Sequence, residues 1–257
     1  MTPQRIWISY FTMMRREFVR IIRIWSQTLL PPVVTTSLYF IVFGTFIGSQ
    51  LAPIHGFSYI QFIVPGLIMM GVITSSYSNT VSTFYFAKWV RNIDELLVSP
   101  TPDWVVIAGF VSGGVLRGLL VGVLVLICSL FFTHLVIANA LVLVAALVLT
   151  SVLFSFAGLI NGIYAKGFDG ISIVPTFVLT PLTYLGGIFF SISMFPPFWQ
   201  TVSLFNPILY MVNAFRFGFL GITDIPLWIC FSVLIGLTIA FSAVSIFLFK
   251  RGKGIKN

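Results

Sequence analysis

Charged side chains that could bind another polypeptide gather in one short segment, residues 87–100, with the sequence AKWVRNIDELLVSP. Long apolar runs flank it on both sides, so it must be an aqueous loop between two membrane spans, because charged groups are costly in hydrocarbon. A plain solvated connection would explain its charges but not the apolar residues among them. We therefore expect a docking surface for a partner protein. Its polar members are Lys88, Arg91, Asp94 and Glu95, and its apolar members are Ile93, Leu96 and Leu97.

No other group of residues suggests catalysis. His55 and His134 each stand alone in a turn, without a nearby Asp, Glu or Cys, so neither a metal site nor a nucleophilic triad is predicted. Cys128 and Cys230 fall within apolar runs, where a thiol behaves as a small hydrophobe. The one Gly-Lys pair, at 252–253, is followed by glycine and is not a phosphate-binding Walker A motif. We expect no enzyme activity, metal or cofactor in this chain.

The composition is that of a membrane protein. Hydrophobic residues make up 58% of the 257 residues and charged residues only 8%, too few to cover a soluble domain. The net charge of +8 could suggest nucleic-acid binding, but the basic residues flank apolar runs, which is typical of membrane orientation. The first apolar run lacks a cleavage site and is followed by further runs, so we expect the N-terminus to be retained.

Six apolar runs are each long enough to cross a bilayer as a helix, which requires roughly 20 residues. Small residues in the third run permit close approach of a neighbouring helix, with a subunit interface as a second interpretation. These residues are Gly109, Gly113, Gly114, Gly118 and Gly122. We predict an all-α, polytopic membrane protein with one transmembrane domain over residues 1–257. Its spans lie at about 29–51, 58–83, 105–132, 135–164, 171–192 and 225–249.

Residues 4–27 form a basic amphipathic helix. Its apolar residues recur every three or four positions and make one face, while Arg5, Arg16, Arg20 and Arg23 project from the opposite face. Such a helix lies in the membrane surface, with its arginines among anionic headgroups. We therefore predict an interfacial helix, in contact with membrane lipids, before the first span.

Lysine and arginine residues predict the orientation of the spans. Twelve of them fall on one side of a six-span topology: five in the N-terminal helix, two in segment 87–100, one after the fourth span and four in the C-terminal tail. The opposite loops contain only Arg216. Because loops rich in basic residues stay in the cytoplasm, both termini and segment 87–100 are predicted to be cytoplasmic.

Arg117 is a functional candidate because it lies inside the third span. It follows Trp104 by thirteen residues, or roughly 20 Å of helix, which is too deep for easy access to the surface. No acidic residue lies deep in a span to pair with it. Backbone carbonyls, Asn161, water and a lipid phosphate all stay open as its partners.

Hydroxyl groups follow one face of the fifth span. Thr176, Thr180 and Tyr184 share this face, and Pro175 and Pro181 loosen the same helix. Such a face requires protein or water beside it instead of lipid. Helix packing explains it adequately, and a substrate pathway, which would also include Arg117, is the sharper interpretation.

Residues 194–221 form neither a normal span nor a normal loop. The segment is rich in aromatic residues, is interrupted by three prolines and carries a single charge. Asn206 before Pro207 is a typical helix start, with an N-cap side chain and then a proline at the first position. We predict two short re-entrant helices that form an external gate, with aromatic anchoring at the membrane surface as the alternative. The gate residues are Asn206, Pro207, Tyr210, Arg216 and Gly221.

Together these features resemble the ABC-2 type permease family of membrane transporters. The basic N-terminal helix, the six spans, the charged loop after the second span and the pattern from Asn206 to Gly221 match along the whole chain. Four longer stretches resemble bacterial inner-membrane permeases of this family more closely. They are RIWSQTLLPPVVTTSLYFIVFG, HGFSYIQFIVPGLIMM, RNIDELLVSP and LTPLTYLGG.

The resemblance implies a half-transporter that forms a homodimer in the bacterial inner membrane and binds a separate cytoplasmic ABC ATPase subunit. Residues 88–98 would be a coupling helix seated in a groove of the ATPase, and the N-terminal helix would also contact it. The short external helices would cap the pathway. ATP and Mg would be bound by the partner subunit, and substrate would move outward.

An ion-coupled secondary transporter that needs no ATPase is the alternative. Such carriers usually place Asp or Glu within their spans, whereas all six acidic residues here lie in the N-terminal helix or in loops. The substrate class also stays open. The apolar external segment and the scarcity of charged span residues favour a lipidic or amphipathic substrate, with a drug or a saccharide as further possibilities.

Overall fold

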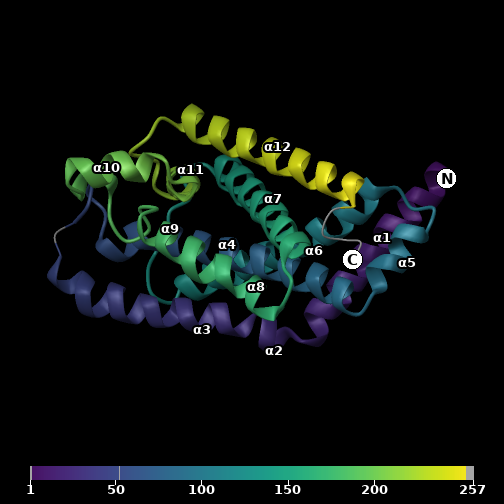
Figure 1. Ribbon diagram of the computed structural model, residues 1–257. Helices are drawn as coiled ribbons and strands as arrows, with labels where there is room; N and C mark the ends of the chain where they lie inside the picture. The colour runs from purple at the N-terminus through teal and green to yellow at the C-terminus, as the bar shows by residue number, and fades with distance from the viewer. Residues whose placement is uncertain (1, 52, 253–257) are drawn as a thin grey trace.

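The computed structural model describes residues 2–51 and 53–252, which form helices and contain no β-strand (Figure 1). Two π-helical stretches, Phe40–Ile47 and Pro175–Leu179, continue α3 and α8. The α-helices are α1 (Pro3–Arg23), α2 (Trp25–Thr28), α3 (Leu30–Tyr39), α4 (Tyr59–Trp89), α5 (Asn92–Val98), α6 (Asp103–Ser129), α7 (Ala140–Tyr164), α8 (Phe168–Val174), α9 (Thr180–Tyr184), α10 (Pro197–Leu204), α11 (Pro207–Leu220) and α12 (Leu227–Arg251).

Five helical stretches of the described chain are long and apolar enough to cross a membrane: Trp25–Gly44, α4, α6, α7 and α12. They correspond to five of the six predicted spans, with shifted ends. Residues 130–139 are not helical, although the predicted spans left only two residues between them. The reason is a contact with α11, because the backbone N–H groups of Ala138 and Asn139 donate to the carbonyls of Phe219 and Gly218 at 3.1 and 2.9 Å.

The predicted fifth span, 171–192, corresponds to an uninterrupted helical stretch that ends at Tyr184 instead of residue 192. It begins as α8, widens into the π-helix at Pro175 and ends with α9 at Tyr184. Pro175 and Pro181 lack the N–H group that a regular helix requires, and the Thr180 hydroxyl donates to the Pro175 carbonyl at 3.0 Å. The chain then turns at Gly187, which has a φ of +71° that L-residues rarely adopt. Residues after this turn enter the core instead of extending the span.

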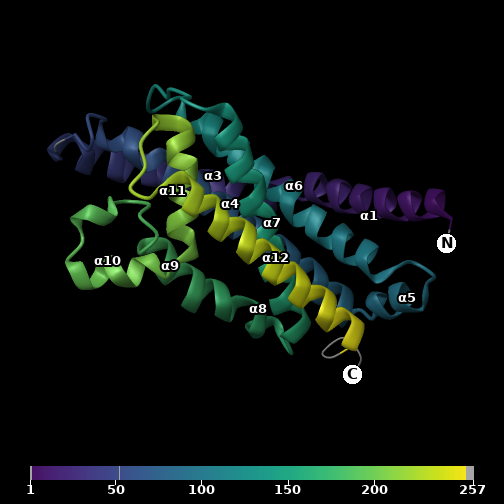
Figure 2. The same cartoon turned by 90° about the horizontal axis from the view of Figure 1, so that it is seen from above.

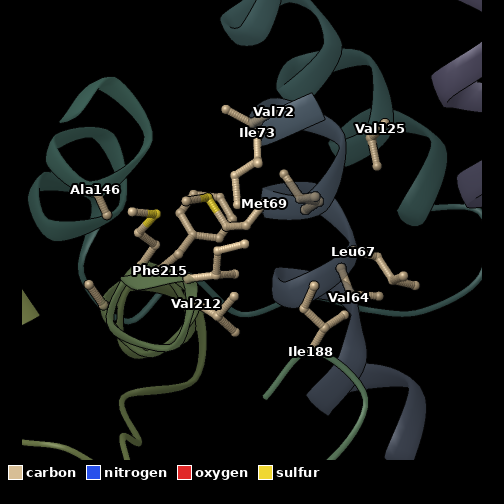
Figure 3. Packing of buried hydrophobic residues seen from close by; sticks show 14 of the residues in the cluster. Val64, Leu67, Met69, Val72, Ile73, Val125, Ala146, Ile188, Val212 and Phe215 are labelled. Atoms are coloured by element: carbon tan, nitrogen blue, oxygen red, sulfur yellow. The ribbon is translucent and has the colours of Figure 1, made fainter. Parts of the chain in front are cut away.

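Helix α4 is the centre of the fold and the most buried of the long helices. Helices α6 and α7 pack along it, and α11 closes one end. Figure 3 shows side chains of α4 directed toward Val212 and Phe215 of α11, with Ile188, from the turn after α9, on another side. Lipid tails are as apolar as these side chains, so close packing, more than exclusion of water, holds the helices together.

The glycines of α6 serve this close packing within the chain. A Cβ atom at Gly113 would lie 2.9 Å from the Cγ of Glu17 in α1. A Cβ at Gly114 or Gly118 would overlap side chains of α4 and α7, including Thr80 and Ser76. The packing interpretation of the glycines is therefore confirmed, because α1, α4 and α7 already occupy the surfaces that these glycines open.

The elements are distributed between two ends of the bundle. Helices α1 and α5 and the last turn of α12 lie at one end, which we call the α5 end, and α10 lies at the other, the α10 end (Figures 1 and 2). Helix α1 extends away from the bundle at the α5 end (Figure 2). The N-terminal helix and segment 87–100 thus share one end, as an even number of crossings between them requires.

Candidate functional site

The segment predicted as a docking surface contains a short helix fixed at the α5 end. Helix α4 continues to Trp89, so Lys88 belongs to α4 and not to a loop. Arg91, with a φ of +61°, makes the turn into α5. Ile93 is 1% exposed and anchors α5 in a cluster to which Leu96 and Leu97 also pack. The buried members of this cluster include Met13, Phe84, Val106, Phe110, Leu159, Leu248 and Phe249.

The opposite face of α5 is exposed. It carries Asp94 and Glu95, and Arg91 is exposed just before the helix. Val98 is 86% exposed, which is unusual for an apolar side chain in a helix of seven residues. Sequence reasoning missed Val98 and placed Leu96 and Leu97 in the partner's groove. Both leucines are only partly exposed, so Val98 offers the larger apolar contact on this surface.

Lys88 has a structural partner within the chain. Its Nζ donates to the carbonyls of Ile163 and Ala165 at 2.9 and 3.1 Å, at the C-terminal end of α7. The last carbonyls of a helix lack partners in the helix and carry partial negative charge, so a lysine is well placed there. Lys88 therefore links α4 to α7. Of the four polar residues predicted to contact the ATPase, the exposed ones are Arg91, Asp94 and Glu95.

Helix α1 does not keep all of its charges on the outer surface. Trp7, Phe11 and Phe18 are exposed, as an apolar face turned to the membrane would be, and so are Arg16 and Arg23. Arg20 differs from the prediction because it is partly buried. Its side chain turns inward toward Glu17, which sequence reasoning passed over as one more charge on a basic helix.

Glu17 is 1% exposed and faces α6 at the space left by Gly113. Arg20 Nη2 donates to Glu17 Oε2 at 2.7 Å and to Asn79 Oδ1 of α4 at 3.0 Å. Arg16 lies 3.5 Å from the other carboxylate oxygen. Burial raises the pKa of Glu17 and lowers the pKa of Arg20, while their mutual attraction opposes both shifts. The pair fixes α1 against α4 and α6.

The predicted gate residues tie α11 to its neighbours at the α10 end. Asn206 accepts from the Ile208 N–H at 3.0 Å and donates to the Leu182 carbonyl at 2.6 Å, so it caps α11 as predicted and also fastens it to α9. The Tyr210 hydroxyl donates to the Leu204 carbonyl at 2.6 Å. Gly221, with a φ of +71°, ends the helix.

Arg216 is almost fully buried, with 1% of its surface exposed. Its Nη2 donates to the Gly187 carbonyl at 2.5 Å, and its guanidinium lies 3.8 Å from the centre of the Phe62 ring. A cation over an aromatic face is stabilised by the ring quadrupole. These contacts join α11, α4 and the turn after α9. The segment does contain two short helices, α10 and α11, and their re-entrant placement stays a prediction. Their role as a gate stays a prediction.

His55 is not isolated, contrary to the sequence analysis. Its Nε2 lies 3.8 Å from Oδ1 of Asp224, in the segment between α11 and α12. Asp224 also accepts from the Ser191 hydroxyl at 2.9 Å. The two residues lie 169 positions apart in the sequence, so their spacing gave no indication of this contact. The described residues contain no group of three His, Cys, Asp or Glu side chains suited to a metal ion.

Two cavities lie side by side along the exposed edge of α4 and share Ser78. One, of about 270 Å³, lies between α3 and α4 and contains Arg117 of α6. The other, of about 280 Å³, lies against α8 and contains Thr176. Thr180 and Tyr184 are also exposed, further along the same stretch. The predicted pathway residues therefore fall on either side of one polar strip of α4, formed by Thr74, Ser78 and Ser82.

Comparison with known proteins decides the family. The sequence pattern of the family described as ABC-2 type transporter matches residues 8–220. This chain belongs to the ABC-2 type transporter family. It is 55% identical over 251 residues to the inner membrane transport permease YadH of Escherichia coli (strain K12), with 98% of each chain covered. Nodulation protein J of Rhizobium leguminosarum bv. viciae is 21% identical over 218 residues, or 83% of each chain.

Membership of this family confirms the resemblance predicted from the sequence. With five helical stretches of spanning length, the chain is an ABC-2 type membrane permease. Similarity to the E. coli permease extends over α5, the buried pair of α1 and the helices α10 and α11, because nearly the whole chain is aligned. All of these elements therefore lie in the aligned part of the chain, and none is an unaligned terminal extension.

Proposed function

We propose that this chain is the membrane subunit of an ATP-driven exporter, which moves an amphipathic substrate outward across the bacterial inner membrane. The family to which it belongs supports a transport role, and the bundle supplies the spans for one. The chain acts as a homodimer and receives its energy from a separate cytoplasmic ABC ATPase subunit, which binds ATP and Mg.

The observation that carries the proposal is the geometry of α5. Its inner face is anchored by Ile93 in a cluster that includes residues of α1, α4, α6, α7 and α12. Its outer face presents Asp94, Glu95 and Val98 to the surroundings. A movement imposed on the outer face would therefore pass to several spans at once, which is the mechanical requirement for coupling.

Exposed hydroxyl groups support the homodimer. Thr176 and Thr180 are exposed on a stretch that runs along the bundle beside α4, and Tyr184 is 52% exposed. In a lipid environment such a surface needs a protein or water neighbour. A second copy of the chain placed against α8 and α9 would cover it and enclose the polar strip of α4 between the two copies. That strip is then the substrate pathway.

The shared position of the basic segments supports the proposed orientation. The arginines of α1, the α5 segment and the basic end of α12 lie together at the α5 end. Basic segments remain on the cytoplasmic side, so the α5 end faces the cytoplasm and the α10 end faces the outside. The ATPase docks where nucleotide is available, and α10 and α11 cap the outer end of the pathway.

The test is a charge reversal on α5. The full chain is expressed with an ABC ATPase subunit that forms a complex with it, and the complex is purified and reconstituted into liposomes. We expect Glu95→Lys to fold normally but to lose most of the ATPase stimulation and transport, because a like charge at a docking surface opposes association. Asp103→Lys, an equal charge change at an exposed position in the first turn of α6, is the matched control and retains both activities.

Normal ATPase stimulation and export by the Glu95→Lys variant would remove the coupling role of α5. Transport driven by an ion gradient in liposomes that hold neither ATPase nor nucleotide would instead support the ion-coupled carrier. A complex that is active with one permease chain for each ATPase pair would contradict the homodimer.

A further inference from the structure

The cavity of about 270 Å³ beside α4 has a polar inner end and a wall open to the membrane. Arg117 and Ser75 lie at the inner end. Gln27, Pro31, Thr35 and Thr74 line it too, and all four are exposed, so the cavity opens at the surface of the bundle between α3 and α4. This opening faces lipid in a single copy of the chain.

Arg117 carries a charge that nothing in its surroundings balances. Its Nη2 donates to the Thr28 carbonyl at 3.0 Å, and its Nε is buried without a hydrogen-bond partner. All six carboxylates of the chain lie within the described residues, and none forms an ion pair with Arg117. A cation held among apolar helices without a counter-ion is costly, so the site favours an incoming anion.

Two other arginines that turn inward differ from Arg117 in having a carboxylate nearby, although Arg20 Nε and the Nε and Nη1 of Arg216 also lack hydrogen-bond partners. Arg20, whose charge repels that of Arg117, is paired with Glu17 and bonded to Asn79. Arg216 lies over Phe62 and shares its cavity with Asp224. Each has a carboxylate close by. The residues that line the Arg117 cavity include no acidic side chain.

A second polar group points to the same ligand. Ser75 is 2% exposed and lines the cavity, yet its Oγ has no hydrogen-bond partner among the described residues. A buried hydroxyl without a partner is unfavourable. The hydroxyl and the Arg117 Nε are both donors, so a group that fills the inner end must supply acceptors. An oxyanion such as a phosphate does this.

An apolar groove continues from the cavity along α3. It measures about 290 Å³, shares Thr35 and Tyr39 with the cavity, and is otherwise lined by Leu38, Val42 and Phe43. Leu38 and Val42 are exposed. The polar end of the cavity, which favours an anion, therefore leads directly into a groove suited to an alkyl chain. An anionic amphiphile has the same two parts, a charged headgroup and an apolar chain.

We propose that the cavity between α3 and α4 binds the anionic headgroup of a membrane amphiphile, with Arg117 and Ser75 on a phosphate and the alkyl chain along α3. This inference rests on the proposed function in one respect, since it makes the cavity the place where a permease of amphiphiles takes its substrate from the membrane. The binding itself requires no ATPase.

The test measures binding to the purified full chain in a neutral maltoside detergent, without nucleotide. The probe is a fluorescent lysophosphatidic acid, with the zwitterionic lysophosphatidylcholine as the neutral-headgroup comparison. We expect one bound lysophosphatidic acid per chain, and about tenfold weaker binding by Arg117→Gln, because a charge-assisted hydrogen bond is lost. Arg117→Lys retains part of the affinity, and Ser75→Ala weakens binding severalfold.

The matched control is Arg251→Gln, which removes one exposed basic charge at the cytoplasmic end of α12 and reports general attraction of the chain for anions. It should bind lysophosphatidic acid as the unaltered chain does. Leu38→Gln makes the groove polar and should weaken a long-chain probe more than a short-chain one. Thermal unfolding of every variant shows that it is folded before its binding is compared.

Three outcomes would overturn the proposal. Equal losses in Arg117→Gln and Arg251→Gln would mean that binding is non-specific. Equal affinity for the two lysophospholipids would mean that the site does not distinguish headgroups by their charge. Complete competition by millimolar inorganic phosphate would mean that the site binds the free anion and not an amphiphile. Failure of the Glu95→Lys experiment would leave this result untouched, because no ATPase is present.

Discussion

Glu17 and Arg20 illustrate how one residue pair can decide where a whole helix lies. The sequence places them among five basic residues on a helix suited to the membrane surface, where charges usually stay in water. Gly113 of α6 leaves room for the Glu17 side chain, and Arg20 follows it to reach Asn79 of α4. A buried pair of this kind adds little stability by itself, but loss of one partner is severe.

We predict unequal effects of removing the two charges. Arg20→Met leaves the buried Glu17 with only Arg16 at 3.5 Å, and should cost about 3 kcal/mol of stability. Glu17→Gln retains an acceptor for Arg20, which is partly exposed and can keep its hydration, so it should cost less than half as much. Thermal unfolding in detergent measures both.

The double variant Glu17→Gln/Arg20→Met is the control for this comparison. It removes the charge that Arg20→Met leaves unpaired, so it should be more stable than Arg20→Met alone. Equal melting temperatures for Arg20→Met and Glu17→Gln would show that Glu17 is not held as a buried charge.

At the level of elements, α5 separates a buried anchoring face from an exposed face, proposed for docking, within seven residues. Ile93 holds its inner face, and Asp94, Glu95 and Val98 form its outer face. Helical periodicity alone makes this possible, since residues three and four apart share a face. A helix that is held in the bundle on one face and contacted by a partner on the other can transmit movement to the spans. A flexible loop of the same composition would not.

We predict that substitutions on the two faces of α5 have different effects on stability and on ATPase binding. Ile93→Ala should reduce stability by about 2–4 kcal/mol, since it leaves a cavity in a packed cluster, and ATPase stimulation should fall because α5 is no longer rigidly held. Val98→Asp removes an exposed apolar contact, so it should leave the melting temperature within a degree or two but reduce ATPase binding. A Val98→Asp variant that binds the ATPase normally would exclude this residue from the interface.

The spans and caps of this fold are predictable from the sequence, but the direction of individual side chains is not. Apolar runs located α4, α6 and α12 because the bilayer requires a minimum length, and Asn206 marked the start of α11. The rotation of α5 about its axis depends on packing against α1 and α12, so Val98 could not be distinguished from Leu96. The effect of Pro175 was also underestimated, since a proline can widen a helix or end it.

The candidate site shows the same division. The sequence alone marked Arg117 as a functional candidate, because a charged side chain inside a membrane span is costly and rare. Its cavity was not predictable, since the lining combines α3, α4 and α6 over about ninety positions of the sequence. Likewise, the Asp224 partner of His55 becomes visible only when the segment before α4 and the segment between α11 and α12 meet in the fold.

At the scale of the whole molecule, the two ends of the bundle differ in charge and in architecture. The α5 end carries the arginines of α1, the acidic α5 and the basic end of α12. The α10 end carries short apolar helices and aromatic side chains, with Arg216 turned inward. This asymmetry is the physical basis for the proposed orientation in the membrane, with the proposed docking and capping elements at opposite ends.

We predict the orientation in a form that labelling can test. In a chain with Cys128 and Cys230 replaced by alanine, a cysteine at Glu95 should react with a membrane-impermeant maleimide only after the cells are opened. A cysteine at Phe205, which is 86% exposed between α10 and α11, should react in intact cells. Labelling of both sites in intact cells would contradict placement of the two ends on opposite sides, and the reversed pattern would put α5 outside, where no ATPase could reach it.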